Sequence, residues 1–117
     1  MRLALIGYGV MGRVIRTLAE EKGHDIAVVI DKGHANLRAG EVSEMLKGSD
    51  VAIEFTTGLA VRRNVEACVT ARIPVVVGTT GWQEERTVIE SLVRDGGGAM
   101  VYGANFSIGV NLFYKIA

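Results

Sequence analysis

The sequence has few of the residues that mark secreted, membrane or nucleic-acid-binding proteins. Its 117 residues include one cysteine, which excludes an internal disulfide. Its apolar runs are far shorter than the about 20 residues that a membrane-spanning helix needs, and no signal-peptide pattern opens the chain. Thirteen basic residues balance thirteen acidic ones, so no overall field attracts nucleic acid or an anionic membrane. We therefore expect a cytoplasmic protein that binds neither nucleic acid nor membranes.

Histidine and cysteine are too sparse and too scattered to predict a metal site. His24 and His34 fall at a predicted helix end and in a predicted loop. Cys68 shares a helical spacing with Val61 and Val65, which is typical of a buried thiol rather than of a nucleophile. We predict no metal ligands, and we assign no catalytic residue.

Strand and helix patterns alternate along the whole chain. Continuous β-branched and apolar runs predict strands over 3–6, 26–30, 51–55, 75–77 and 99–102. Helical spacing of apolar residues predicts helices over 11–22, 42–46, 59–71 and 108–117, and one around 88–93 that ends before Gly96. The only proline, Pro74, opens a strand, where a missing N–H costs little. This order predicts one α/β domain over 1–117, a doubly wound parallel sheet of Rossmann type.

Three glycines with the spacing G-x-G-x-x-G connect the first strand to the first helix. In a dinucleotide-binding turn, Gly7 would make the tight turn, Gly9 would let the backbone approach a pyrophosphate, and Gly12 would allow close helix packing. A helix that begins near Val10 directs its free N–H groups at that anion. Asp31 follows the second predicted strand, about 20 residues after Gly12, where a carboxylate holds the adenosine ribose.

Four predicted loops follow strand ends and carry small or hydroxyl residues. They cover 7–12, 55–58, 78–81 and 103–107. Because ligands of such sheets bind outside the carboxyl ends of the strands, we expect these loops to converge on one crevice. Lys32 follows Asp31 and could attract a 2′-phosphate, so the pair predicts tolerance of both NAD(H) and NADP(H). Arg13 is a further candidate for phosphate contact, although an exposed helical arginine with no ligand is also consistent.

Several segments together resemble the 4-hydroxy-tetrahydrodipicolinate reductase (dihydrodipicolinate reductase) family. The resemblance lies in the glycine turn and Arg13 over 7–13, the Phe55-Thr56 pair, the Gly-Thr-Thr-Gly segment over 78–81, and the longer Ala-Asn-Phe-Ser-Ile-Gly-Val-Asn segment over 104–111. It spans the whole chain but covers only the N-terminal, nucleotide-binding part of the family. Where the family usually has an aspartate before Phe-Thr, this chain has Glu54.

The resemblance implies a nicotinamide-dependent reductase of diaminopimelate and lysine biosynthesis. The family's substrate domain, with its paired histidines, has no match in this sequence, so we expect this chain to bind NAD(P)H without reducing the cyclic imine substrate. A homotetramer, assembled mainly through that other domain, is also implied. The residues implied to contact the dinucleotide are Gly7, Tyr8, Gly9, Val10, Met11, Gly12, Asp31, Lys32, Phe55, Thr56, Gly78, Thr79, Thr80, Gly103, Ala104, Asn105 and Phe106.

Two alternatives remain open at this point, because a fold does not fix a function. The chain could be the nucleotide-binding part of another NAD(P)-dependent dehydrogenase, or a free-standing NAD(P)-sensing module that acts through a partner. A binder of S-adenosylmethionine or of a mononucleotide is disfavoured by the full glycine triplet combined with Asp31.

Overall fold

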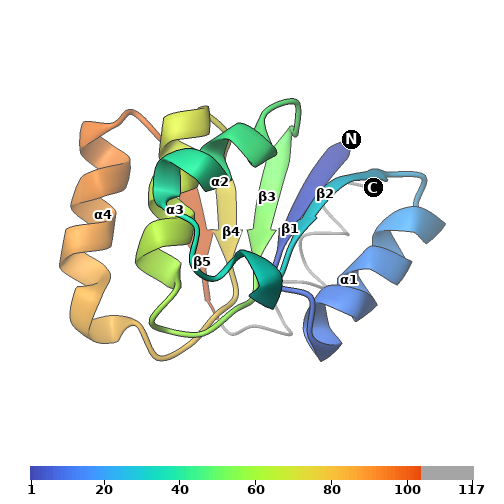
Figure 1. Cartoon of the computed structure of the whole chain (residues 1–117), viewed down its shortest axis with the longest axis horizontal. Coiled ribbons are helices and arrows are strands. Elements are labelled where there is room, and N and C mark those ends of the chain that lie inside the picture. Colours follow the sequence, from blue (N-terminus) through green and yellow to red (C-terminus); the bar gives the residue numbers. More distant parts are fainter. Residues whose placement is uncertain (104–117) are drawn as a thin grey trace.

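The computed structural model describes residues 1–103, which form a five-stranded parallel sheet with helices on both faces (Figure 1). The strands follow the spatial order β2-β1-β3-β4-β5. Their bounds are β1 Arg2–Ile6, β2 Asp25–Ile30, β3 Val51–Glu54, β4 Val75–Val77 and β5 Met100–Tyr102. The predicted doubly wound parallel sheet is confirmed.

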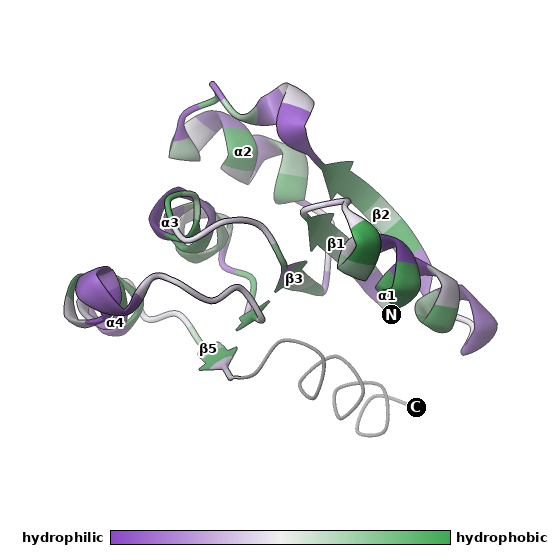
Figure 2. Ribbon diagram, turned by 90° about the horizontal axis from the view of Figure 1, so that it is seen from below, coloured by the Kyte–Doolittle hydropathy of each residue, from purple (hydrophilic) through white to green (hydrophobic). Residues whose placement is uncertain are grey.

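Within residues 1–103, four α-helices connect these strands and form two layers around the sheet. They are α1 Val10–Glu21, α2 Ala39–Leu46, α3 Val61–Ala71 and α4 Arg86–Asp95. Seen along the strands, α1 covers one face of the sheet and α2, α3 and α4 lie side by side on the other (Figure 2). No helix of the described part, residues 1–103, is long and apolar enough to cross a membrane.

Alternating side chains of the central strands supply two separate cores. On β1, Leu3 and Leu5 pack toward α1, whereas Ala4 and Ile6 pack toward α2 and α3. All four are at most 1% exposed. Because neighbouring residues of a strand point to opposite faces, a continuous apolar run is what a strand covered on both sides requires.

Helix ends account for most of the differences between the predicted and observed elements. α2 begins three residues before the predicted 42–46, because the Glu41 side chain accepts the Arg38 N–H at 3.1 Å and caps an earlier start. α3 begins at Val61 rather than at residue 59, since a turn closed by the Ala60 N–H and the Thr57 carbonyl precedes it. Two 3₁₀ turns, η1 Lys32–His34 and η2 Gln83–Glu85, were not predicted. The helix predicted over 108–117 lies outside the described residues.

The order in which the chain adds strands to the sheet reverses at β1. From β1 the chain moves outward to β2 and then returns to the other side of β1 as β3. All strands point the same way, so the loops after them lie at one edge, beside the first turn of α1 (Figure 1). In an open α/β sheet, ligands bind in the crevice at this reversal point.

Candidate functional site

The loops after β1, β3 and β4 meet in an open cavity of about 210 Å³ at the carboxyl edge of the sheet. Every residue that lines it belongs to the set predicted to bind a dinucleotide. The lining residues are Gly9, Val10, Met11, Gly12, Phe55, Thr56, Gly78, Thr79 and Thr80. The structure therefore brings three segments that are distant in the sequence onto one surface.

The three motif glycines meet different local demands. Gly7 has a φ of +106°, and a Cβ added to it would lie 1.9 Å from the Phe55 carbonyl oxygen. A Cβ on Gly12 would lie 2.4 Å from the Gly7 carbonyl oxygen. A Cβ on Gly9 would meet no atom of the described chain within 4 Å. Packing thus requires a bare backbone at Gly7 and Gly12, whereas at Gly9 it leaves open space beside the cavity.

The first turn of α1 presents backbone N–H groups beside that space. Gly9 is the N-cap residue and no side chain caps the helix. The first backbone bond of the helix runs from the Arg13 N–H to the Gly9 carbonyl at 3.1 Å. The N–H groups of Val10, Met11 and Gly12 therefore have no acceptor within the helix, which is the usual situation at a helix N-terminus that holds an anion.

Tyr8 and two arginines form a cation-π cluster next to the glycine turn. The Arg13 guanidinium lies 4.7 Å from the centroid of the Tyr8 ring, and that of Arg16 lies 5.8 Å from it. Arg16 also donates to the Tyr8 hydroxyl at 3.2 Å. Arg13, the predicted candidate for phosphate contact, is thus placed beside the turn, and Arg16 joins it one helical turn later.

Asp31 and Lys32 follow β2, the strand beside β1, and do not line the cavity. Asp31 directly follows β2, and the carbonyl of the preceding residue, Ile30, accepts the Gly7 N–H at 2.7 Å. The Asp31 carboxylate caps η1 by accepting the Gly33 N–H at 2.9 Å, and the side chain stays about half exposed (51%). His34 Nδ1 lies 3.3 Å from that carboxylate but accepts the Asp31 N–H at 3.0 Å, so in this tautomer it is an acceptor and the contact is not an ion pair.

Glu54 is a buried polar residue to which the sequence pattern assigned no role. It ends β3, is 0% exposed, and accepts hydrogen bonds from the Thr56 hydroxyl, the Thr79 hydroxyl and, at 2.8 Å, the Asn64 amide. Burial raises the pKa of its carboxyl group, and these hydrogen bonds act in the opposite direction. The sequence did carry a signal: an acidic residue inside the buried run 51–55, a position that apolar side chains normally occupy.

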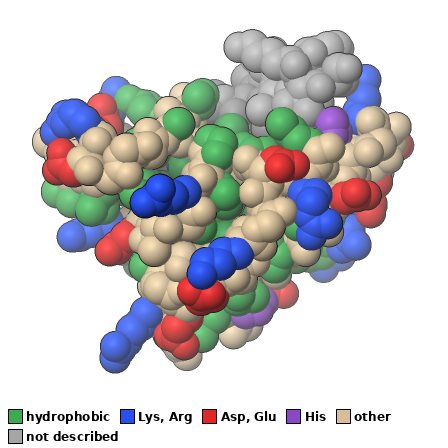
Figure 3. Space-filling view, turned by 90° about the horizontal axis from the view of Figure 1, so that it is seen from above, with side chains coloured by type: hydrophobic (Ala, Val, Ile, Leu, Met, Phe, Trp, Pro, Cys, Tyr) green, Lys and Arg blue, Asp and Glu red, His purple; other side chains and the backbone are tan. Residues whose placement is uncertain are grey.

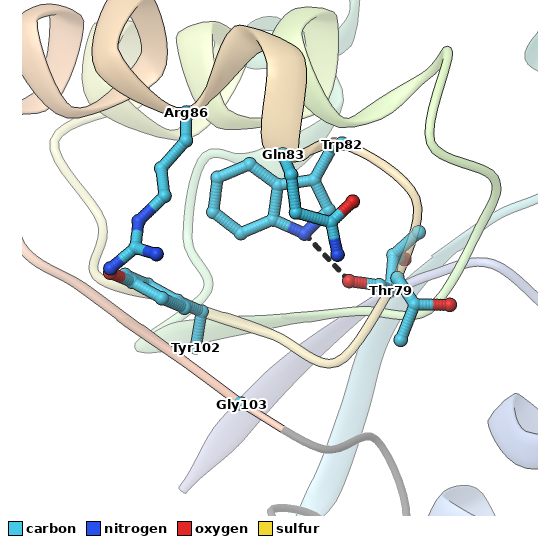
Figure 4. A pocket seen from close by; sticks show the side chains of 7 residues that line it. Thr79, Trp82, Gln83, Arg86, Tyr102 and Gly103 are labelled. Carbon is cyan, nitrogen blue, oxygen red and sulfur yellow. Dashed lines mark hydrogen bonds between the residues drawn. The ribbon is translucent and has the colours of Figure 1, made fainter.

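A second cavity, of about 230 Å³, adjoins the first through Thr79 and Thr80. It also contains Gly103, so the loop after β5 reaches the same edge of the sheet. Four further lining residues were not predicted: Trp82, Gln83, Arg86 and Tyr102. Figure 4 shows the Trp82 indole donating to the Thr79 carbonyl, at 2.7 Å, and the Arg86 guanidinium at the Tyr102 hydroxyl. The Trp82 contact lies within the loop after β4, whereas the Arg86 contact joins α4 to β5, and no sequence motif signals either of them.

The remaining predicted site residues are Ala104, Asn105 and Phe106, which lie outside the described residues. Within residues 1–103, no group of three or more His, Cys, Asp or Glu side chains is placed to hold a metal ion. Cys68 is buried as predicted, and burial raises the pKa of its thiol to about 12. Basic and acidic side chains are interspersed on the face that Figure 3 shows, in keeping with the balanced charge of the sequence.

Solved structures with a similar fold include dehydrogenases. A 3-hydroxyisobutyrate dehydrogenase from Mycobacterium tuberculosis matches 88% of this chain and 40% of its own, with a TM-score of 0.66 and 21% identity. A homoserine dehydrogenase from S. aureus matches 89% of this chain and 32% of its own, with a TM-score of 0.63 and 17% identity. At these identities the likeness shows the fold alone.

Sequence comparison gives a narrower result. A 4-hydroxy-tetrahydrodipicolinate reductase from Christiangramia forsetii is 34% identical over 116 residues, which are 99% of this chain and 46% of that protein. Reductases of the same name from Acinetobacter baylyi and Methanocaldococcus jannaschii are 28% and 35% identical over 98% and 81% of this chain. The chain spans less than half the length of these relatives, 48% and 37% of the last two.

The family comparison agrees with these relatives. The family described as "Dihydrodipicolinate reductase, N-terminus" matches residues 1–106, which include the glycine turn and all three loops of the first cavity. The chain therefore belongs to the 4-hydroxy-tetrahydrodipicolinate (dihydrodipicolinate) reductase family, of which it matches the N-terminal part.

Proposed function

We propose that this chain binds NAD(P)H as the nucleotide-binding part of a 4-hydroxy-tetrahydrodipicolinate reductase. The observation that carries the proposal is the cavity at the N-terminus of α1. Every residue that lines it was predicted to contact a dinucleotide. The open space at Gly9 next to the uncapped first turn of α1 supports it, because a pyrophosphate needs backbone N–H groups that it can approach closely.

The adenosine half of the dinucleotide lies toward β2 in this proposal. The N–H groups of Val10, Met11 and Gly12 hold the pyrophosphate, and the exposed Asp31 carboxylate accepts hydrogen bonds from the ribose hydroxyls. Lys32 provides a cation for the 2′-phosphate of NADP(H). We therefore propose that both NADH and NADPH bind.

The nicotinamide half extends to the other side of β1, over β3 and β4. Phe55, Thr56, Gly78, Thr79 and Thr80 line the cavity there, and Gly103 lines the adjoining one. When bound, the reduced nicotinamide supplies a hydride. The residues of this chain hold and orient the ring and exclude water from its face. Gly7, Tyr8, Ala104, Asn105 and Phe106 complete the proposed binding set.

For the whole protein we propose reduction of a cyclic imine dicarboxylate in diaminopimelate and lysine biosynthesis, by a homotetramer. This chain has no match to the family's paired histidines, so the proton of that reaction comes from elsewhere in the whole protein. The fold-level likeness to other dehydrogenases is equally compatible with other substrates and favours none of them.

Calorimetric titration of the 117-residue chain with NADH and with NADPH tests the binding proposal. We expect saturable one-to-one binding of both, and no turnover of the imine substrate above background. Absence of heat with both nucleotides would refute the binding proposal. Turnover at a rate comparable to that of a full-length relative would refute the division of roles.

Two substitutions test the adenosine end. Asp31→Asn removes the carboxylate charge and should weaken NADH binding about tenfold, the effect of losing one charged hydrogen bond. Lys32→Ala should weaken NADPH binding more than NADH binding. An unchanged ratio of the two dissociation constants in Lys32→Ala would reject Lys32 as the contact to the 2′-phosphate.

A further inference from the structure

Glu54 joins the loops after β3 and β4, and it is buried and does not line the first cavity. Its Oε2 accepts from the Thr56 hydroxyl and from Asn64, and its Oε1 accepts from the Thr79 hydroxyl. The two threonines are also joined directly, because the Thr56 N–H donates to Thr79 Oγ1 at 2.6 Å. The carboxyl group therefore closes a hydrogen-bonded ring that contains one threonine from each loop.

This carboxyl group is placed where packing alone would favour an apolar side chain. Glu54 is 0% exposed on the central strand of the sheet, and its hydrogen-bond partners Thr56, Thr79 and Asn64 are all neutral. Taking a carboxyl group out of water costs free energy even when it is hydrogen-bonded, and an apolar residue of similar volume is often neutral or stabilising at such a site. Stability therefore gives no reason for Glu54 to be here.

The ring instead links two residues that line the cavity. Thr56 and Thr79 both line it, whereas Glu54 does not. The same two loops also touch through their backbones, since a Cβ on Gly58 would lie 2.2 Å from the Gly81 carbonyl oxygen. The Thr79 carbonyl is held in addition by the Trp82 indole, at 2.7 Å. The spacing between the loops is thus set by several contacts, of which the Glu54 ring is the one that joins two residues lining the first cavity.

The sheet order assigns these loops to one half of the ligand. Asp31 lies on the β2 side of the glycine turn, so a dinucleotide whose pyrophosphate rests on α1 places its other nucleoside over β3 and β4. Resting on the proposed function, we infer that Glu54 is a positioning residue for the nicotinamide half. It holds the Thr56 and Thr79 hydroxyls, so that the two loops are preorganised to contact the nicotinamide ring. Glu54 touches no ligand and acts only through the two threonines.

Binding of NADH compared with binding of ADP-ribose tests this inference, because ADP-ribose keeps the adenosine half and both phosphates but lacks the nicotinamide. Glu54→Gln keeps the size of the side chain and, compared with the ionised carboxylate, turns one acceptor oxygen into a donor group, which opposes one of the three donors. We expect NADH affinity to fall about tenfold and ADP-ribose affinity to stay within about twofold. Thermal unfolding of the same samples establishes that the variant is folded.

A second pair of variants makes the test independent of whether Glu54→Gln folds. Thr79→Ser keeps the hydroxyl that links Thr56 to Glu54, and Thr79→Val keeps the shape but removes the hydroxyl. We expect Thr79→Val to reproduce the selective loss of NADH affinity, and Thr79→Ser to retain affinity within about threefold of the original chain.

The outcomes separate this inference from the proposed function. If the unsubstituted chain binds neither NADH nor ADP-ribose, both fail. If it binds both, and the folded Glu54→Gln variant loses affinity for the two ligands equally or for neither, the proposed function stands and the positioning role of Glu54 is overturned. Equal affinities of Thr79→Val and Thr79→Ser for NADH would overturn it as well.

Discussion

A Cβ on Gly7 would lie 1.9 Å from the carbonyl oxygen of Phe55, so the turn after β1 rests directly on the backbone at the end of β3. Gly7 also has a φ of +106°, a conformation that other residues rarely adopt. Any side chain at this position strains the turn and pushes the two loops apart. The contact joins the glycine turn to one of the loops that carry the cavity threonines.

We expect Gly7→Ala to destabilise the fold by at least about 2 kcal/mol, because the strain of a positive φ adds to a clash with backbone that cannot swing away. Urea unfolding followed by circular dichroism measures the change. Gly40→Ala is the matched control: Gly40 lies in α2, and a Cβ there would meet no described atom within 4 Å. That control should be neutral or stabilising by up to about 1 kcal/mol. Equal effects of the two changes would contradict the packing role of Gly7.

Gly9→Ala should separate binding from folding. Gly9 has an extended backbone, with a φ of −82°, and free space where its Cβ would be, so we expect the free energy of unfolding to change by less than about 1 kcal/mol. The added methyl group enters the space beside the helix N-terminus that we assign to the pyrophosphate. NADH affinity should therefore fall about tenfold or more, measured by calorimetry. Unchanged affinity in the folded variant would place the pyrophosphate elsewhere.

Arg63 holds the segment after Asp31 in place from α3. Its Nη1 donates to the carbonyl groups of His34, Ala35 and Leu37 at 2.7, 3.2 and 3.1 Å, and its Nε and Nη2 both donate to Asn64 Oδ1. We expect Arg63→Met to cost about 1–3 kcal/mol of stability, since it leaves several carbonyl groups without their donor. ADP-ribose affinity should also fall, because the segment that begins at Asp31 loses its anchor.

The neighbouring Arg62 provides the control for this experiment. It is exposed and forms one ion pair with Glu85, with a 3.4 Å distance between Arg62 Nη1 and Glu85 Oε2. Exposed pairs of this kind contribute about 0–1 kcal/mol, so Arg62→Met should leave both stability and ADP-ribose affinity nearly unchanged. If the two arginine variants behave alike, the anchoring role of Arg63 is wrong.

Local patterns in the sequence predict most of the fold. The run 26–30 predicts a strand because continuous β-branched and apolar residues suit a parallel sheet, and β2 occupies Asp25–Ile30, although it is an edge strand in which only Ile30 is buried. The helix predicted to close at Lys22 and Gly23 ends there, with Lys22 as its C-cap and Gly23 at a φ of +83°. The cavity lining was predictable for the same reason, because parallel strands bring their carboxyl ends to one edge.

The polar contacts that hold the site together were not predictable in this way. The Glu54 ring joins residues 25 positions apart, and Arg63 reaches a carbonyl 29 positions away. No regular sequence spacing predicts the partners of either side chain, because the tertiary arrangement of β3, β4 and α3 sets them. Sequence reasoning can mark a buried acidic residue as unusual, but only the assembled sheet shows which hydroxyl groups it meets.

The buried Glu54 carboxyl gives a pH dependence of stability with a definite sign. Burial raises the pKa of this group in the folded chain, so the folded state binds its proton more tightly than the unfolded state does. Its favourable contribution is fully present below about pH 4.5, the ordinary value, and is lost as the pH rises through the higher pKa of the folded state. Glu54→Gln has no proton to lose at this position. We therefore expect the stability of the original chain, relative to Glu54→Gln, to decrease as the pH rises from about 4 to 8.

Urea unfolding of both proteins at matched pH values measures this difference. Every other titrating group is common to the two chains, so subtracting one stability profile from the other isolates Glu54. Equal m-values at each pH would show that the same amount of surface unfolds in both. A difference that stays constant across this range, or that favours the original chain at high pH, would show that the three hydrogen bonds outweigh burial and hold the pKa of Glu54 at or below its ordinary value.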